Sequence, residues 1–135
     1  MELSIIYEGD LRTKASHPES GAVLHTDAPK DNQGKGEAFS PTDLLGVALG
    51  SCALTLMGIA AKKWGLELKG SRVVLEKTML KNPRRIGKIV LHFYMSTTSS
   101  DEIKSALEKA ALECPVHHSL DPAMIQEFHF HWEMA

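Results

Sequence analysis

Two cysteines are the residues of this 135-residue chain with the most distinctive chemistry, and they lie far apart in the sequence. Cys52 is in the middle of an uncharged run, residues 44–61, and Cys114 directly precedes Pro115. If the fold brings the two thiols together, a peroxide could oxidise one of them to a sulfenic acid. The other thiol could then condense with it to form a disulfide. The pair therefore favours redox chemistry, provided that the fold places the two sulfur atoms side by side.

Cys52 receives little help from its own helix in forming a thiolate. It lies about 16 Å from the helix start at 1.5 Å per residue, where the helix dipole is weak. Burial in an apolar run also disfavours the charged form. A reactive Cys52 therefore needs a cation from elsewhere in the fold, and the alternative is an inert core cysteine.

Cys114 is predicted to cap a short helix at residues 115–120, because Pro115 disfavours the helical conformation for the residue before it. A sulfur atom at a helix N-terminus lies near the positive end of the dipole, which favours its thiolate. His117 and His118 fall in the first turn and could add positive charge. The alternative is a small apolar residue that fills the end of a helix.

Two other roles stay open, one for the cysteines and one for the histidines. A permanent disulfide between the cysteines would close a loop of about 60 residues and add roughly 4 kcal/mol in the chain-entropy model. His92, His129 and His131 could bind a metal, although alternating histidines are also typical of a half-polar sheet face. The two cysteines do not have the spacing of a zinc finger. We expect no metal site and no cofactor.

The element that must position these residues is a long helix at 40–64. Ser40, Pro41 and Asp43 form the pattern of a helix start, with Asp43 at the acidic position of a capping box. The uncharged run that follows makes the helix apolar on every side, so other protein is expected to surround it. The run is also long enough to span a membrane. Its many small residues instead favour a core helix that neighbours, including its own copy in a dimer, approach closely.

The rest of the chain alternates between strand and helix patterns and shows no repeat or linker, so we expect a single domain at 1–135. The fold class is α+β, with antiparallel sheets wrapped around the long central helix. The expected elements are strands at 3–7, 11–16 and 22–26, a loop at 27–39, a hairpin with strands at 66–80 and 86–96, a helix opened by a capping box at 99–102, and a last strand at 127–133.

Composition narrows the class of protein. The net charge is -2 and 43% of the residues are hydrophobic, which fits one domain with a substantial core. Charges of both signs are spread along the chain, so we expect no nucleic-acid or membrane partner. The N-terminus is acidic and alternating, unlike a signal peptide, and we expect a cytoplasmic protein. In that compartment two cysteines are more often reduced, catalytic or inert than permanently paired.

Three segments resemble the OsmC/Ohr family: SPTDLLGVALGSC, which ends at Cys52, CPVHHSL, which begins at Cys114, and YEGDLR near the N-terminus. The resemblance runs along nearly the whole chain, and the two cysteine motifs together are fairly specific. The segment DAPKDNQGKGEAFSPTDLL resembles the OsmC-like subgroup. The resemblance implies an intertwined α+β homodimer in which curved sheets wrap two central helices, with the active sites at the dimer interface.

The resemblance also implies an activity and residue roles. Members of the peroxidase branches reduce organic hydroperoxides, and a thiol donor, expected to be a dithiol, regenerates the enzyme. By resemblance, Cys52 is the peroxidatic cysteine and Cys114 is the resolving cysteine. An arginine stabilises the peroxidatic thiolate in the family and is held by a glutamate from the start of the central helix. Arg12 is the matching arginine, because it lies in the early strand pair.

The acid that would hold Arg12 departs from the family pattern. In the peroxidase branches a glutamate directly follows the proline of the helix start, whereas here Thr42 follows Pro41 and the acid is Asp43. Asp43 comes nine positions before Cys52, which places it about 180° around the helix from that cysteine. Asp43 is therefore either a displaced catalytic carboxylate or only the cap of its own helix.

Three function classes follow. The first is thiol-dependent reduction of organic hydroperoxides. The apolar residues around the central helix would favour an apolar substrate over hydrogen peroxide. The second is a family member that binds a small apolar ligand or partner at the dimer cleft without turnover. The third is another cysteine-dependent enzyme, such as a thiol transferase or hydrolase. Only the first needs both a reactive Cys52 and a disulfide with Cys114.

Overall fold

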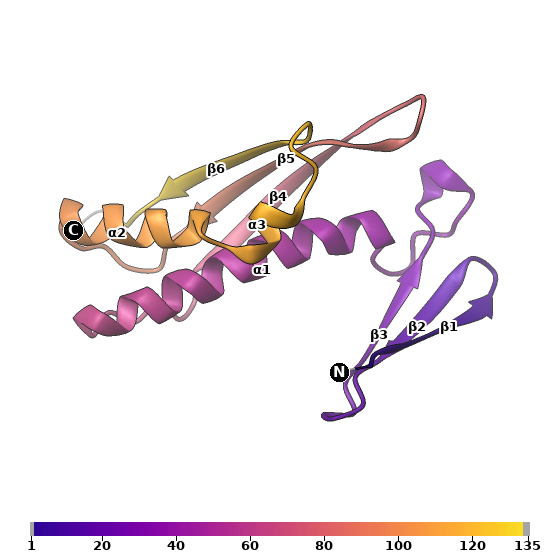
Figure 1. Ribbon diagram of the computed structural model, residues 1–135, viewed down its shortest axis with the longest axis horizontal. Helices are drawn as coiled ribbons and strands as arrows, with labels where there is room; N and C mark the ends of the chain where they lie inside the picture. The colour runs from indigo at the N-terminus through magenta and orange to yellow at the C-terminus, as the bar shows by residue number, and fades with distance from the viewer. Residues whose placement is uncertain (1, 134–135) are drawn as a thin grey trace. The chain divides into compact units, whose positions relative to one another are not determined.

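The computed structural model describes residues 2–133, which divide into two compact units, 2–45 and 46–133. The first unit ends within the first turns of the long helix α1, and each unit is described by itself. Figure 1 shows the elements in chain order. They are β1 (Ser4–Gly9), β2 (Arg12–Ser16), β3 (Val23–Asp27), η1 (Lys30–Asn32), α1 (Pro41–Ala61), η2 (Lys62–Trp64), β4 (Arg72–Leu80), β5 (Arg85–Tyr94), α2 (Asp101–Leu112), α3 (Pro115–Ser119) and β6 (Ile125–His131).

The first unit is an antiparallel three-stranded sheet in the order β1-β2-β3, as the sequence predicts. A tight turn joins β1 to β2, with positive φ at Gly9, Asp10 and Leu11. The loop after β3 folds back on the sheet, since the Asp27 N–H donates to the Phe39 carbonyl at 3.0 Å. The loop therefore begins and ends at the same place, beside the last residue of β3.

The second unit has a mixed sheet in the order β4-β5-β6. The strands β4 and β5 form the predicted hairpin, but β6 runs parallel to β5. Parallel neighbours need a crossover connection, and α2 with α3 supplies it. An alternating strand pattern reports which side chains share a face but not the direction of the neighbouring strand, so the sequence predicted antiparallel sheets only.

One face of α1 packs on this sheet. Its fully buried residues recur every fourth position, Leu49, Ala53, Met57 and Ala61, and they share a core with Ile89, Leu91 and Phe93 of β5. Two glycines of α1 allow the close approach: a Cβ at Gly46 would lie 3.0 Å from the Leu75 side chain, and one at Gly50 would lie 3.4 Å from Val73. Part of the small-residue pattern of α1 is therefore explained by packing within the chain.

The other face of α1 carries exposed apolar side chains. Ile59 is 60% exposed and Leu45 is 41% exposed. The helix is long and apolar enough to cross a membrane by length and composition, and 33% of its most apolar window is buried inside the chain. The core helix of a soluble protein passes the same test of length and composition. The sequence predicted burial of α1 on all sides, and packing within the second unit buries one side.

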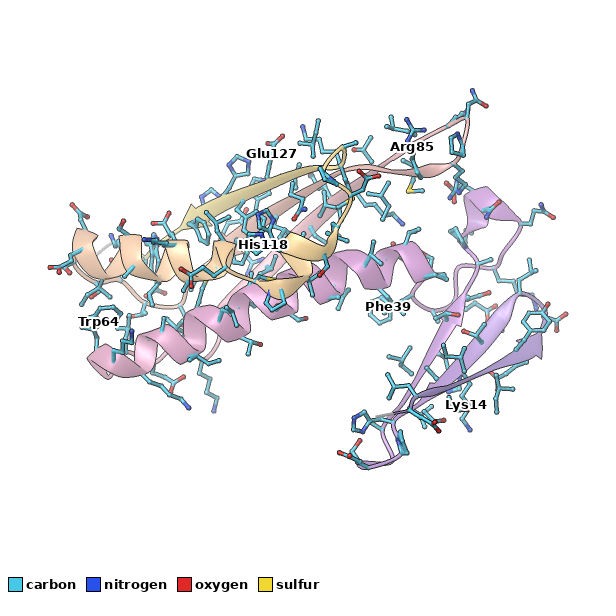
Figure 2. All side chains as sticks on the ribbon, viewed as in Figure 1. Lys14, Phe39, Trp64, Arg85, His118 and Glu127 are labelled. Carbon is cyan, nitrogen blue, oxygen red and sulfur yellow. The ribbon has the colours of Figure 1, made fainter. Side chains whose placement is uncertain are left out.

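The helices α2 and α3 complete the helical layer against the inner face of the β4-β5-β6 sheet. Ser100 caps α2, and its Oγ accepts the Ile103 N–H at 3.3 Å. The predicted capping box at 99–102 is thus shifted by one residue, and an isoleucine stands where the box needs an acid. Figure 2 labels His118 on α3 and Glu127 on β6, and shows side chains on both faces of this sheet.

Candidate functional site

The two cysteines meet in the second unit. Cys52 comes from the middle of α1, and Cys114 is the N-cap residue of α3. Their side chains interact, since Cys52 is one of the neighbours that raise the pKa of Cys114, and both thiols are free. Cys114 is fully buried and Cys52 is half-buried. Two residues more than 60 positions apart in the chain thus form a contact pair in the reduced state.

The sulfur of Cys114 receives backbone donors from the start of α3. The His117 N–H donates to Sγ at 3.4 Å, and the Val116 N–H also donates. These two donors lower the pKa of Cys114, but burial and the contact with Cys52 outweigh them and raise its pKa above the ordinary value of 9.0. The capping position was predicted correctly. Of the two influences on the thiol, desolvation by burial outweighs the helix N-terminus.

His117 is held in place by the neighbouring strand β6. Its Nδ1 lies 2.6 Å from Oε1 of Gln126, and its carbonyl accepts from Gln126 Nε2 at 3.2 Å. The ring lies edge-on to Phe128 and to His118, with centroid distances of 5.3 Å and 5.0 Å. Sequence reasoning did not identify Gln126, because nothing in the pattern of β6 indicates which helix its side chain meets.

Arg12 is paired with a carboxylate in the first unit. Its Nη1 lies 3.4 Å from Oε2 of Glu37, and both side chains are partly exposed. The Glu37 backbone N–H donates at 2.9 Å to Oδ2 of Asp27, whose side chain is fully buried. Glu37 was missed from the sequence because it lies in the 27–39 loop, and only the fold-back of that loop brings it to β2.

Asp43 completes the capping box predicted for α1. Its N–H donates to Ser40 Oγ at 3.0 Å, and its Oδ2 accepts the Ser40 N–H at 3.0 Å. The side chain of each residue therefore accepts the backbone N–H of the other at the helix start. This geometry gives Asp43 a structural role in the helix N-terminus, while a carboxylate for Arg12 is supplied by Glu37.

The histidines of the β4-β5-β6 sheet form a stacked row on its outer face. His92 Nδ1 lies 3.2 Å from His131 Nε2, and the His92 and His129 ring centroids are 5.0 Å apart. Glu127 on the same face pairs with Lys88 at 2.8 Å. Within residues 2–133, no three His, Cys, Asp or Glu side chains are grouped so that they could hold a metal ion. The row matches the half-polar sheet face considered above.

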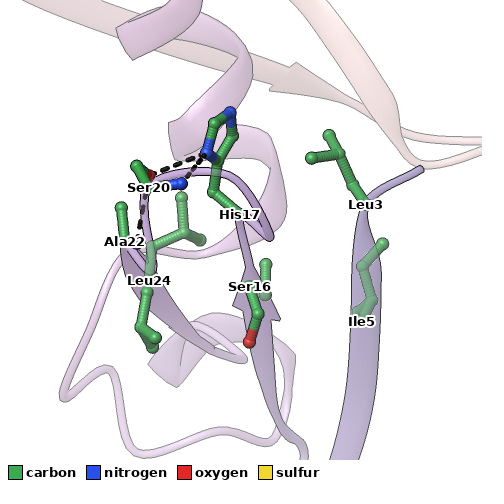
Figure 3. Close-up of a pocket in the computed structure, with 9 residues that line it drawn as sticks. Leu3, Ile5, Ser16, His17, Ser20, Ala22 and Leu24 are labelled. Atoms are coloured by element: carbon green, nitrogen blue, oxygen red, sulfur yellow. Dashed lines mark hydrogen bonds between the residues drawn. The ribbon is translucent and has the colours of Figure 1, made fainter. Parts of the chain in front are cut away.

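A separate hollow of about 420 Å³ lies on the first unit (Figure 3). Its walls are largely apolar and include Leu3, Ile5 and Leu24. The turn between β2 and β3 closes one end, where His17 Nδ1 bonds to Ser20 Oγ at 2.7 Å. The hollow suits an apolar group with a polar function at one end.

Comparison with known proteins identifies the family. Residues 34–127 match the OsmC family, described as OsmC-like protein. The chain belongs to the OsmC-like protein family. This match covers the central helix, both cysteines and most of the β4-β5-β6 sheet. Among curated proteins, no sequence matches this OsmC-like chain.

Solved structures of other proteins share the fold of this OsmC-like protein. A protein from Psychrobacter arcticus 273-4, named for osmotic stress induction and a detoxification response, is 40% identical over 96% of this chain and 94% of that chain, with a TM-score of 0.92. The organic hydroperoxide resistance protein OsmC of Legionella pneumophila is 16% identical over 96% and 94%, with a TM-score of 0.74. An organic hydroperoxide resistance protein from Elizabethkingia anophelis is 13% identical over 97% and 94%, with a TM-score of 0.74.

Proposed function

We propose that this OsmC-like protein reduces organic hydroperoxides in a two-cysteine cycle, with Cys52 as the peroxidatic cysteine and Cys114 as the resolving cysteine. The observation that supports the proposal most directly is the interaction of the two thiols in the reduced protein. They come from different helices, so the contact is a product of the tertiary fold. Proteins of the same fold are named for organic hydroperoxide resistance, which agrees with this chemistry.

The cycle balances in three steps. The Cys52 thiolate breaks the O–O bond of the hydroperoxide, and the products are an alcohol, after one proton is taken up, and a sulfenic acid on Cys52. Cys114, as thiolate, then attacks the Cys52 sulfur, and the departing hydroxide leaves as water with the proton that Cys114 gave up. An external dithiol reduces the disulfide by two exchange steps and is itself oxidised to a disulfide.

Arg12 is the cation that we assign to the Cys52 thiolate. Cys52 lies deep in α1, where the helix dipole gives little stabilisation, so a charge from another element is needed. The contact with Glu37 would orient the guanidinium, and Asp27 would hold the Glu37 backbone. We therefore assign the carboxylate role to Glu37, and the helix-cap role to Asp43.

The functional assembly that we propose is a cytoplasmic homodimer without nucleic-acid or membrane partners. The first unit exposes large apolar side chains on its small sheet: Ile5 is 72% exposed, Tyr7 64% and Leu3 61%. Ile59 on α1 is similarly exposed. Exposed apolar patches of this kind mark interaction surfaces, and a second copy of the chain would cover them. A reducing compartment would also keep the two thiols ready for peroxide.

A second candidate function is the binding of a small apolar ligand without turnover. The apolar hollow beside Leu3, Ile5 and Leu24 is the observation that favours it. A binding protein of this type needs neither a reactive Cys52 nor a disulfide with Cys114. Turnover therefore separates the two functions.

The test is consumption of cumene hydroperoxide with dithiothreitol as the dithiol, compared with the monothiol glutathione and with hydrogen peroxide as substrate. The proposal predicts turnover of cumene hydroperoxide with dithiothreitol in the wild-type protein. It predicts none in Cys52→Ser and weaker turnover with hydrogen peroxide. Wild-type consumption equal to that of Cys52→Ser would leave the ligand-binding function as the better account, and the hollow would then be titrated with fatty acids.

A further inference from the structure

The side chain of Gln126 on β6 forms two hydrogen bonds with His117, in the turn that follows Cys114. Gln126 Nε2 donates to the His117 carbonyl, and Gln126 Oε1 lies 2.6 Å from His117 Nδ1. A carbonyl oxygen can only accept, so the amide nitrogen must face it and the amide oxygen must face the imidazole. Nδ1 therefore carries the proton and donates to Oε1, which fixes the tautomer of His117.

These two contacts between Gln126 and His117, called the clamp below, act on the residue that contacts the Cys114 sulfur. His117 donates its backbone N–H to Cys114 Sγ at 3.4 Å. The helix that contains His117 has only five residues, and a helix this short does not hold its own shape without tertiary contacts. Gln126 supplies such a contact to the backbone and to the side chain of the same residue.

These contacts matter because Cys114 is a buried thiol that must lose its proton to attack. Burial and the neighbouring Cys52 raise the pKa of Cys114, and the two backbone donors of α3 oppose that rise. The backbone N–H groups at the start of α3 therefore stabilise the Cys114 thiolate. Displacing His117 would remove part of that stabilisation and move the sulfur relative to Cys52.

We propose that Gln126 is a positioning residue for the resolving step: through His117 it keeps the start of α3 against the Cys114 sulfur and in reach of Cys52. The step affected is the condensation of the Cys52 sulfenic acid with the Cys114 thiol, which gives a disulfide and water. In this respect the inference rests on the proposed function. Gln126 acts through its hydrogen bonds with His117, so its effect on the reaction with peroxide is indirect.

The first test separates the two oxidation steps by stopped-flow single turnover with cumene hydroperoxide, using Gln126→Ala and Gln126→Glu. The glutamate variant keeps the side-chain shape but places an oxygen against the His117 carbonyl. Both variants are expected to form the sulfenic acid at a rate within about twofold of wild type and the disulfide about tenfold more slowly. The control Glu127→Gln, one position along β6 on the outer face, is expected to change neither rate.

The second test does not depend on peroxidase activity. The pH dependence of Cys114 alkylation by iodoacetamide is measured in a Cys52→Ser background, with and without Gln126→Ala or Gln126→Glu. The clamp predicts that the midpoint moves to higher pH in both Gln126 variants and stays in place in Glu127→Gln. Melting temperatures of the same samples report whether each variant is folded.

The outcomes distinguish the two proposals. If the wild-type protein forms no sulfenic acid, the peroxidase proposal fails, and the alkylation profile alone decides whether the clamp exists. If the wild type cycles but folded Gln126→Glu forms the disulfide at the wild-type rate, with an unchanged alkylation midpoint, the clamp proposal is wrong.

Discussion

Glu37 and Arg12 form an ion pair between two segments that are 25 residues apart, with 3.4 Å between Oε2 and Nη1. The loop that carries Glu37 folds back on β3, and the buried Asp27 accepts the Glu37 backbone N–H. The arginine that resemblance assigns to the peroxidatic site thus has a carboxylate partner. That partner comes from the loop before the central helix.

The Arg12–Glu37 pair predicts graded losses in the rate of Cys52 oxidation. Arg12→Met removes the cation and is expected to slow sulfenic acid formation at least about tenfold, and Arg12→Lys is expected to lie in between because it lacks the planar fork. Glu37→Gln removes only an exposed ion pair, so about a two- to fivefold loss is expected. Stopped-flow rates with cumene hydroperoxide measure each effect, and Lys14→Gln on the same strand is the control. Wild-type oxidation in Arg12→Met would refute this assignment.

Asp43→Ala is predicted to lower stability without lowering reactivity. The substitution breaks the reciprocal capping box with Ser40, which costs about 1 kcal/mol of unfolding free energy. Urea unfolding should show this loss, and Ser40→Ala should show a similar one, while Cys52 oxidation stays within about twofold of wild type. A large loss of oxidation rate at unchanged stability would instead make Asp43 the catalytic carboxylate.

The raised pKa of Cys114 predicts how stability depends on pH. The native state keeps this thiol protonated to higher pH than the unfolded chain, whose cysteine has the ordinary pKa of 9.0. Its contribution is therefore complete below about pH 9 and is lost as the pH rises through the raised value. Melting temperatures of the wild type and Cys114→Ser should differ by a constant amount from pH 7 to 8. Above pH 9 the wild type should lose stability relative to the variant, and a relative gain would contradict the burial of a neutral thiol.

The same raised pKa predicts that the resolving step accelerates as the pH rises above neutrality, because the attacking species is the Cys114 thiolate. Single-turnover rates of disulfide formation between pH 6.5 and 9.5 measure this dependence. A Cys114→Ser sample reports the sulfenic acid step alone. A resolving rate that is flat over this range would mean that proton loss from Cys114 does not limit the step.

The exposed apolar face of α1 predicts a dimer that a single charge disrupts. Ile59 is 60% exposed in the chain, so Ile59→Asp costs the isolated fold little but would bury a charge in the interface. Light scattering should give about twice the chain mass of 14.8 kDa for the wild type and a smaller mass for the variant. Ile125→Asp, at another exposed isoleucine, is the control. A monomeric wild type would argue against the proposed assembly.

Local patterns predicted the elements of this fold well, and tertiary relationships less well. The helix start at Ser40 and Asp43 and the capping position of Cys114 follow from rules that act within four residues, and both are confirmed. The parallel direction of β6 and the ion pair of Glu37 depend on how distant segments return to one another.

The electrostatics of Cys114 show the same division. A helix N-terminus is visible in the sequence, but the burial that reverses its effect is a property of the packed core. The clamp from Gln126 likewise depends on β6 lying beside α3. The candidate site was therefore predictable as two cysteines, whereas its second layer of contacts required the structure.

The most direct test of the account is the rate of disulfide formation between Cys52 and Cys114 after one equivalent of cumene hydroperoxide is added to the reduced protein. Free thiols and intact mass are followed in the wild type, Cys52→Ser and Cys114→Ser. The account predicts that the wild-type disulfide forms within seconds, that Cys52→Ser does not react, and that Cys114→Ser stops at a sulfenic acid or oxidises further. Survival of both wild-type thiols through minutes of excess peroxide would contradict the peroxidase function.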